Sequence, residues 1–142
     1  GLVLACDAPR RFEVTWEMMG DVSWVSVSLA AVTSTSTRLT LVHEAAVPEE
    51  FWKQFGPGAV GIGWDLALLG MELHLATKAA VDPEAFQAWT VSDEGRSVVR
   101  GAGRGWIEAQ VAFGTSRAES EASGGRAIAF FSGEAPPEGH SP

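Results

Sequence analysis

Hydrophobic and polar residues alternate in three successive segments near the start of the chain, at residues 11–17, 22–29 and 37–45. Successive side chains of a β-strand point to opposite faces, so this alternation predicts three strands with one apolar face each. A further strand is expected over residues 2–6, before a turn at residues 7–9. Together these segments predict an antiparallel sheet that is buried on one side.

The alternation also predicts which side chains share the apolar face of the sheet. Glu13, Ser26 and Arg38 fall on the polar face of their segments. Large rigid side chains on an apolar face can either fill a core or line a pocket for a hydrophobic ligand. The apolar face is expected to carry Phe12, Val14, Trp16, Val25, Val27, Leu29, Leu39, Leu41 and His43.

A long apolar helix is predicted directly after the sheet, over residues 51–75. The Gly-Pro-Gly sequence at residues 56–58 should bend or break this helix, because proline disrupts the interior of a helix. At about 100° of rotation per residue, bulky side chains fall on two faces of the helix. Only Asp65 and Glu72 form a narrow acidic stripe, which we interpret as a solvated edge or as salt-bridge partners. We therefore expect this helix to lie between the sheet and the layer that follows it.

The rest of the chain is predicted to be helical. Asp82, Ser92 and Ser116 each stand before a helical pattern and can accept hydrogen bonds from its first turn. The last of these helices is expected to be interrupted at residues 124–125, both glycine, and a disordered tail is expected from Gly133 onwards. The middle helix should use apolar residues that recur at spacings of three and four, namely Val99, Ala102, Trp106, Ala109 and Phe113.

Composition and charge restrict the classes of function. A length of 142 residues suits a single domain with a sizeable core. The formal net charge of −8 and the absence of a basic patch argue against nucleic-acid binding. Cys6 is the single cysteine, so no intrachain disulfide forms and a cytoplasmic location is expected. Acidic residues, His74 and several glycines interrupt the longest apolar stretch, residues 59–76, so we expect no membrane span.

Three stretches together resemble the SRPBCC superfamily, in its branch similar to the activator of heat shock protein 90 ATPase. They are ACDAPRRFEVTWE (residues 5–17), TRLTLVHEA (residues 37–45) and FWKQFGPGAVGIGWDLALLGMELHLA (residues 51–76). Residues 92–119 are similar to a helical extension common in actinobacterial members. The resemblance implies a START-like helix-grip fold, in which a curved antiparallel sheet grips a long helix around a hydrophobic pocket.

Members of that family have additional strands and two short helices ahead of the point where this sequence starts. The resemblance therefore implies a fragment, a gene model that starts too late, or a front half supplied by another chain. A homo-oligomer or a complementing N-terminal half is the expected protein partner, because an open sheet edge and half a cavity favour association. The implied domains are a partial helix-grip domain (residues 1–78), a helical extension on the long helix (79–132) and a disordered tail (133–142).

Few residues suggest chemistry. The glycines of residues 56–61 match G-x-G-x-x-G, but a dinucleotide site needs a preceding strand, and here the preceding segment is helical. We interpret these glycines as a bend and a close helix contact. His43 is either a hydrogen-bonded core residue or the acid–base group of an enzyme. The three histidines and Cys6 lack metal-ligand spacing, and no serine stands in a recognisable triad, so no metal or cofactor is expected.

The leading hypothesis is a non-catalytic α+β domain that binds a small apolar ligand, with no nucleic acid as partner. Two alternatives stay open: a polyketide cyclase-like or hydrolase-like enzyme of the same superfamily that uses His43, and a protein-interaction module such as a chaperone co-factor. The candidate residues for lining the ligand cavity are Phe12, Val14, Trp16, Val25, Val27, Leu39, Leu41, His43, Trp52, Phe55, Trp64 and Leu68.

Overall fold

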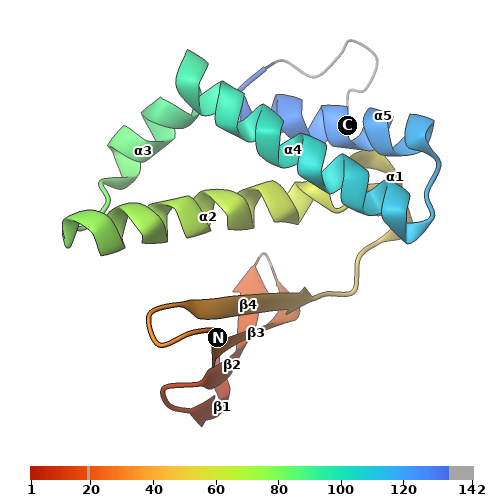
Figure 1. The fold of residues 1–142 in the computed structure, drawn as a ribbon. Coiled ribbons are helices and arrows are strands. Elements are labelled where there is room, and N and C mark those ends of the chain that lie inside the picture. The colour runs from red at the N-terminus through yellow and green to blue at the C-terminus, as the bar shows by residue number, and fades with distance from the viewer. Residues whose placement is uncertain (19, 135–142) are drawn as a thin grey trace. The chain divides into compact units, whose positions relative to one another are not determined.

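A computed structural model describes residues 1–18 and 20–134 of the chain. The described residues form a four-stranded antiparallel sheet and five helices, so the predicted α+β fold is confirmed (Figure 1). The chain divides into two compact units, Gly1–Val47 and Pro48–Pro142. The first unit holds all four strands and the second holds all of the described helices.

The sheet is a meander in which each strand pairs with the next one along the chain, in the order β1-β2-β3-β4 (Figure 1). Each predicted strand segment falls inside one of these strands, except that the first begins one residue early and the last ends one residue late. A cis peptide bond joins Ala8 and Pro9 in the turn between the first two strands. The strands are β1 (Val3–Asp7), β2 (Arg11–Met18), β3 (Asp21–Ala31) and β4 (Thr37–Glu44).

The register of the strands confirms the predicted faces. Val14 lies opposite Val25, which in turn lies opposite His43. Directly opposed residues of antiparallel strands lie on the same face of the sheet, and alternation then carries the assignment along each strand. All nine residues predicted for the apolar face therefore share one face, which the cross-strand pairs Phe12–Val27, Val27–Leu41 and Leu29–Leu39 complete.

The second unit starts with two helices separated by the predicted break. Gly56 ends the first helix with φ of +57°, a conformation that favours glycine. The expected caps are also present: Asp82 accepts from the backbone N–H groups of Glu84 and Ala85, and Ser92 accepts from that of Gly95. The helices are α1 (Glu49–Phe55), α2 (Gly58–Thr77), α3 (Pro83–Thr90), α4 (Asp93–Phe113) and α5 (Arg117–Phe131).

One prediction about the helices was wrong. α5 begins after the predicted cap Ser116 and runs without interruption through Gly124 and Gly125. The backbone of Gly124 lies against Ile107 of α4, where a Cβ would collide with that side chain, so this glycine allows close packing instead of ending the helix. In α4, Val99 is buried and Ala102 and Trp106 pack against the core, whereas Phe113 at the end of the predicted apolar series is 87% accessible. The fully buried positions of α4 are Gly95, Val99, Gly103, Ile107 and Gln110.

The core of the second unit forms where α2, α4 and α5 meet. Ile62 of α2, Val99 of α4 and Ala127 of α5 are buried together, and Trp106 and Phe131 pack around them. Helices α4 and α5 thus supply the following layer that was predicted against the long helix. The other half of that prediction, a sheet on the opposite side of α2, stays a prediction.

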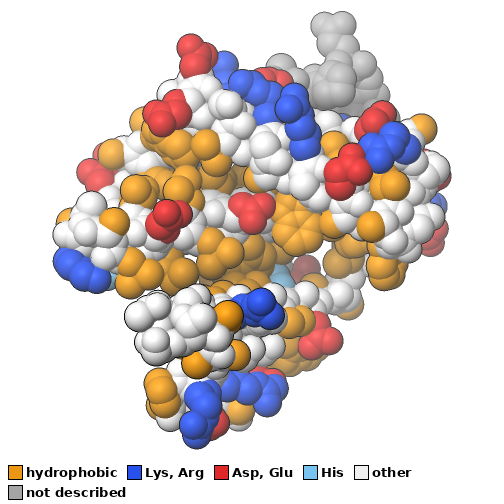
Figure 2. Space-filling model, in the orientation of Figure 1, with side chains coloured by type: hydrophobic (Ala, Val, Ile, Leu, Met, Phe, Trp, Pro, Cys, Tyr) orange, Lys and Arg blue, Asp and Glu red, His pale blue; other side chains and the backbone are white. Residues whose placement is uncertain are grey.

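The C-terminal half of α2 is less covered than its start. Every residue from 71 to 77 is exposed, including Met71, Leu73 and Leu75, and Figure 2 shows hydrophobic side chains along this helix. By length and composition α2 could cross a membrane, and 11% of its most apolar window is buried. One such helix is weak evidence for a span, because the core helix of a soluble protein passes the same test. The absence of a membrane span therefore stays a prediction.

The compact units do not coincide with the domains implied by the family resemblance. They divide the chain between Val47 and Pro48, because α1 and α2 pack with the later helices. Arg126 of α5 fixes α1 in this unit by donating hydrogen bonds to the backbone oxygens of Gln54 (2.6 Å) and Lys53 (3.1 Å). The implied boundary at residue 78 stays a prediction, and most of the predicted tail, residues 135–142, lies outside the described residues.

Candidate functional site

The apolar face of the sheet is the part of the chain that gathers most of the predicted ligand-binding residues. Eight of the twelve candidates lie there, on strands β2, β3 and β4. Val25, at the centre, is 3% exposed, whereas Phe12 and Trp16 of β2 are 42% and 43% exposed. A face with a buried centre and accessible aromatic side chains can take up an apolar group without first unpacking a core.

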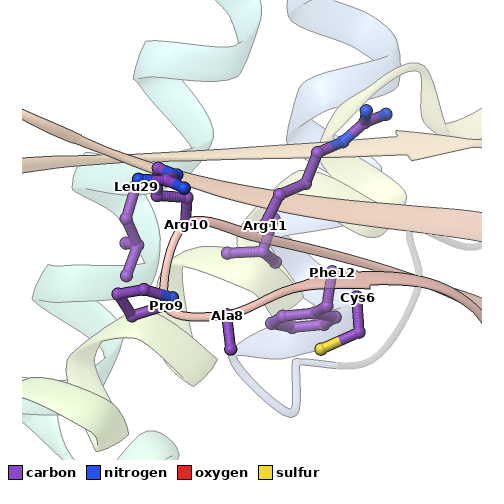
Figure 3. A pocket seen from close by; sticks show the side chains of 8 residues that line it. Cys6, Ala8, Pro9, Arg10, Arg11, Phe12 and Leu29 are labelled. Carbon is purple, nitrogen blue, oxygen red and sulfur yellow. The ribbon is translucent and has the colours of Figure 1, made fainter.

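One end of this face contains a shallow pocket of about 170 Å³. Phe12 forms one wall, and Figure 3 shows Cys6 and Ala8 beside its ring, while the Arg11 guanidinium extends away from it. The turn that follows β1 closes the end of the pocket. The lining residues are Cys6, Ala8, Pro9, Arg10, Arg11, Phe12, Val27 and Leu29.

The sequence pattern predicts some of the residues that line this pocket but not all of them. Phe12 and Val27 were candidate lining residues, and Leu29 was assigned to the same face but not to the site. Cys6 lies opposite Phe12 in the register, a contact that could have been inferred by pairing the predicted first strand with the second. Pro9 lines the pocket because of the way the turn after β1 folds back. The pattern of hydrophobic residues does not predict the path of a turn.

His43 makes a specific contact on the same face. Its Nε2 atom lies 2.8 Å from the Oγ atom of Ser23, in a half-buried position. The Ser23 hydroxyl also lies 3.1 Å from the backbone oxygen of Trp16, to which it can donate. The structure thus places a hydroxyl beside the histidine that was singled out as an acid–base candidate, although no serine had been recognised as its partner.

The four remaining candidates belong to the helical unit. Trp52 and Phe55 lie on α1, where Phe55 packs against Phe51 with ring centroids 5.2 Å apart. Trp64 and Leu68 lie one turn apart on α2, and both are half-buried. These side chains belong to a different unit from the sheet.

The glycine-rich segment at the start of α2 has a packing role. Gly61 lies against the indole of Trp106, and a Cβ on Gly58 would come within 3.1 Å of the Cβ of Ala127. This is the close helix contact that was expected in place of a dinucleotide site. Within residues 1–18 and 20–134, no three histidine, cysteine or acidic side chains come together as metal ligands.

The shifted pKa values belong to exposed ion pairs of the helical unit. Hydrogen bonds from Arg117 hold the pKa of Glu108 below its ordinary value, and the same contact raises the pKa of Arg117. Hydrogen bonds with Glu49 and Glu50 raise the pKa of Lys53. These pairs are solvent-exposed and link turns or helices, so they are structural contacts rather than catalytic groups.

Comparisons of the chain with protein-family models, with curated proteins and with solved structures gave no match. The resemblance to the SRPBCC superfamily, with the helix-grip arrangement and the chaperone-related partner that it implies, therefore stays a prediction. The function must be argued from the geometry of the described residues.

Proposed function

We propose that this protein binds a small apolar ligand on the apolar face of its sheet, anchored in the pocket beside Phe12. The observation that carries the proposal is that one face combines contiguous apolar side chains with a pocket among them. Ligand pockets are typically apolar hollows with a few polar groups at their rim. Here the guanidinium-bearing Arg10 and the Ser23–His43 pair are the polar groups at the two ends of the face.

The volume of the pocket limits the ligand. Pockets for drug-sized molecules enclose about 300–1,000 Å³, whereas this one measures about 170 Å³. A single ring or a short alkyl chain fits that volume, and the rest of a larger ligand would lie along the sheet towards Trp16 and Leu41. The ligand class that follows is a hydrophobic molecule with one narrow apolar end, such as a fatty acyl chain.

The test is a binding titration with a defined probe on the full chain. Dodecanoate serves as the probe, and isothermal titration gives its Kd. Phe12→Ala should raise the Kd about tenfold. The variant loses roughly half of the free energy that full burial of an aromatic side chain contributes to binding. Trp24→Ala is a matched control, because Trp24 is 47% exposed but lies on the opposite face.

Equal effects of the Phe12 and Trp24 variants, or no binding by the unmodified chain, would contradict the proposal. Native mass spectrometry of the purified protein adds an independent readout, since a tightly held natural ligand appears as a fixed mass increment. That increment should disappear in Phe12→Ala and persist in Trp24→Ala.

The contact between Ser23 and His43 favours a second candidate function, an esterase-like hydrolase. In such a reaction, Ser23 Oγ would bond to the acyl carbon of an ester while His43 Nε2 takes the hydroxyl proton. The alcohol would leave with that proton, and water would then hydrolyse the acyl-serine to regenerate the hydroxyl. The backbone oxygen of Trp16 competes for the same hydroxyl proton, which is why ligand binding is the first proposal.

Hydrolysis of p-nitrophenyl acetate tests this second function. Ser23→Ala and His43→Ala should each lower kcat at least a hundredfold, because general base catalysis alone contributes about 10²–10⁴-fold. Ser26→Ala is the control, since Ser26 lies on the polar face of the same strand. Turnover that survives in Ser23→Ala would rule out a serine nucleophile while leaving the binding proposal intact.

A further inference from the structure

We propose that two copies of this chain associate through the edge strand β4, in an antiparallel register centred on Leu41. The meander leaves two edge strands, β1 and β4. The outward N–H and C=O groups of an edge strand can pair with a strand of another chain. The inference goes beyond ligand binding, because it concerns the edge of the sheet and not its apolar face.

The two edges differ in how well they suit such pairing. β1 is short, and its register against β2 shifts between Val3 and Ala5, an irregularity that protects natural sheet edges. β4 follows β3 through eight consecutive residue pairs without a shift. Proline and lysine, which also protect edges, are absent from β4, and residues 39–43 carry no formal charge with histidine neutral. Within the described sheet, β4 is therefore the edge strand that lacks these protective features.

Charge complementarity selects a second copy as the partner and fixes the register. Arg38 and Glu44 stand near the two ends of β4 on its polar face, opposite Ala30 and Trp24 of β3. Within the described part of the chain, neither Arg38 nor Glu44 forms an ion pair. A twofold axis at Leu41 places Arg38 of each copy opposite Glu44 of the other, on the same face, so both charges gain a partner at once.

The same register matches the remaining side chains. Leu41 meets Leu41 of the second copy, and Leu39 meets His43, so the apolar face continues across the axis without an opposed charge. On the polar face, Thr40 meets Val42. Two four-stranded sheets would thereby join into one continuous sheet of eight strands.

Charge reversal on the full chain tests both the interface and its register. Arg38→Glu or Glu44→Arg alone places like charges opposite each other at both ends of the interface. Each variant should raise the dimer Kd about tenfold, as expected when two cross-strand pairs change from attraction to repulsion. Arg100→Glu, a reversal at an exposed position of α4, is the control and should leave the Kd unchanged. Sedimentation equilibrium measures the Kd of each variant.

Mixing gives the decisive result. An equimolar mixture of Arg38→Glu and Glu44→Arg restores opposite charges at both ends, so a heterodimer should form with about the Kd of the unmodified chain. The doubly reversed chain should recover the same Kd alone. A monomeric unmodified chain would overturn the proposal, and so would a dimer that responds to neither reversal. Hydrogen exchange provides a second check: the β4 amides must exchange more slowly in the dimer, and unchanged exchange there would also overturn it.

Discussion

The indole of Trp106 on α4 lies directly against the backbone of Gly61 on α2. The same indole donates from Nε1 to the Oδ2 atom of Asp65, one turn further along α2, at 2.8 Å. The ring is thereby held between a position without a side chain and a carboxylate. The absence of a side chain at Gly61 is therefore what lets this ring approach the helix and reach Asp65.

Gly61→Ala should lower the free energy of unfolding by about 1–3 kcal/mol, because the new Cβ overlaps the rigid fused ring of Trp106. Chemical denaturation followed by tryptophan fluorescence measures this change. Gly70→Ala is the matched control on the same helix, since a Cβ there meets nothing within 4 Å. That variant should instead gain up to about 1 kcal/mol from the higher helix propensity of alanine. Equal effects at the two positions would contradict this account.

Three of the four glycines of α4 should respond differently to alanine. Gly103 faces Ile128 of α5 so closely that a Cβ would collide with it, whereas Gly101 and Gly105 face open space. Gly103→Ala should therefore cost about 1–3 kcal/mol of stability. Gly101→Ala and Gly105→Ala should each stabilise the protein by up to about 1 kcal/mol. Thermal unfolding of the three single variants checks the order, and a stabilising Gly103→Ala would be inconsistent with this packing.

The ion pair between Glu108 and Arg117 should make a small, pH-dependent contribution to stability. Two hydrogen bonds, of 2.8 and 2.9 Å, join the guanidinium to the carboxylate and lower the pKa of Glu108. A carboxylate with a lowered pKa stabilises the fold above its unfolded pKa of about 4.3. That contribution is lost as the pH falls through the folded-state pKa.

Glu108→Gln should accordingly lower Tm slightly at pH 7, and the difference from the unmodified chain should be smaller at pH 3 than at pH 7. The effect is small because both side chains are exposed. Glu72→Gln is the control, since Glu72 forms no ion pair with the described residues and should shift Tm little at either pH. A Glu108→Gln difference that is as large at pH 3 as at pH 7 would refute the assignment.

Cys6 gives a direct report on the proposed ligand pocket. It is the single cysteine of the chain, it is exposed, and it lines the pocket. Dodecanoate at ten times its Kd should slow alkylation of the thiol by N-ethylmaleimide about tenfold, because only the ligand-free fraction reacts. The rate is followed by mass spectrometry. In Phe12→Ala the same dodecanoate concentration should protect much less, and full protection there would place the ligand elsewhere.

The strands and their faces could be predicted from the sequence because a strand has a period of two. Val14, Val25 and His43 needed only that rule to be assigned to one face, and the register agrees. The starts of the helices could be predicted equally well, because Asp82 and Ser92 cap them through local hydrogen bonds. Both kinds of prediction depend on residues that are close in sequence.

Contacts between distant segments were the part that sequence reasoning missed. Gly124 costs about 1 kcal/mol of helix propensity, and its benefit, contact with Ile107, exists only once α4 and α5 are packed. Phe113 fits the spacing of the α4 series, yet it lies at the end of that helix where nothing described covers it. Similarly, the hydroxyl of Ser23 meets His43, 20 positions further along the chain, only once β3 and β4 are paired.

The sequential order of the meander has a kinetic consequence. Each strand pairs with its neighbour in the chain, so every hairpin closes over a short loop. No described strand pairs with one that is distant in the sequence. The entropy lost in closing a loop grows with its length, and topologies rich in local contacts fold faster than those dominated by distant ones. Closing the hairpins of Gly1–Val47 therefore requires no residue of the helices that follow in the chain.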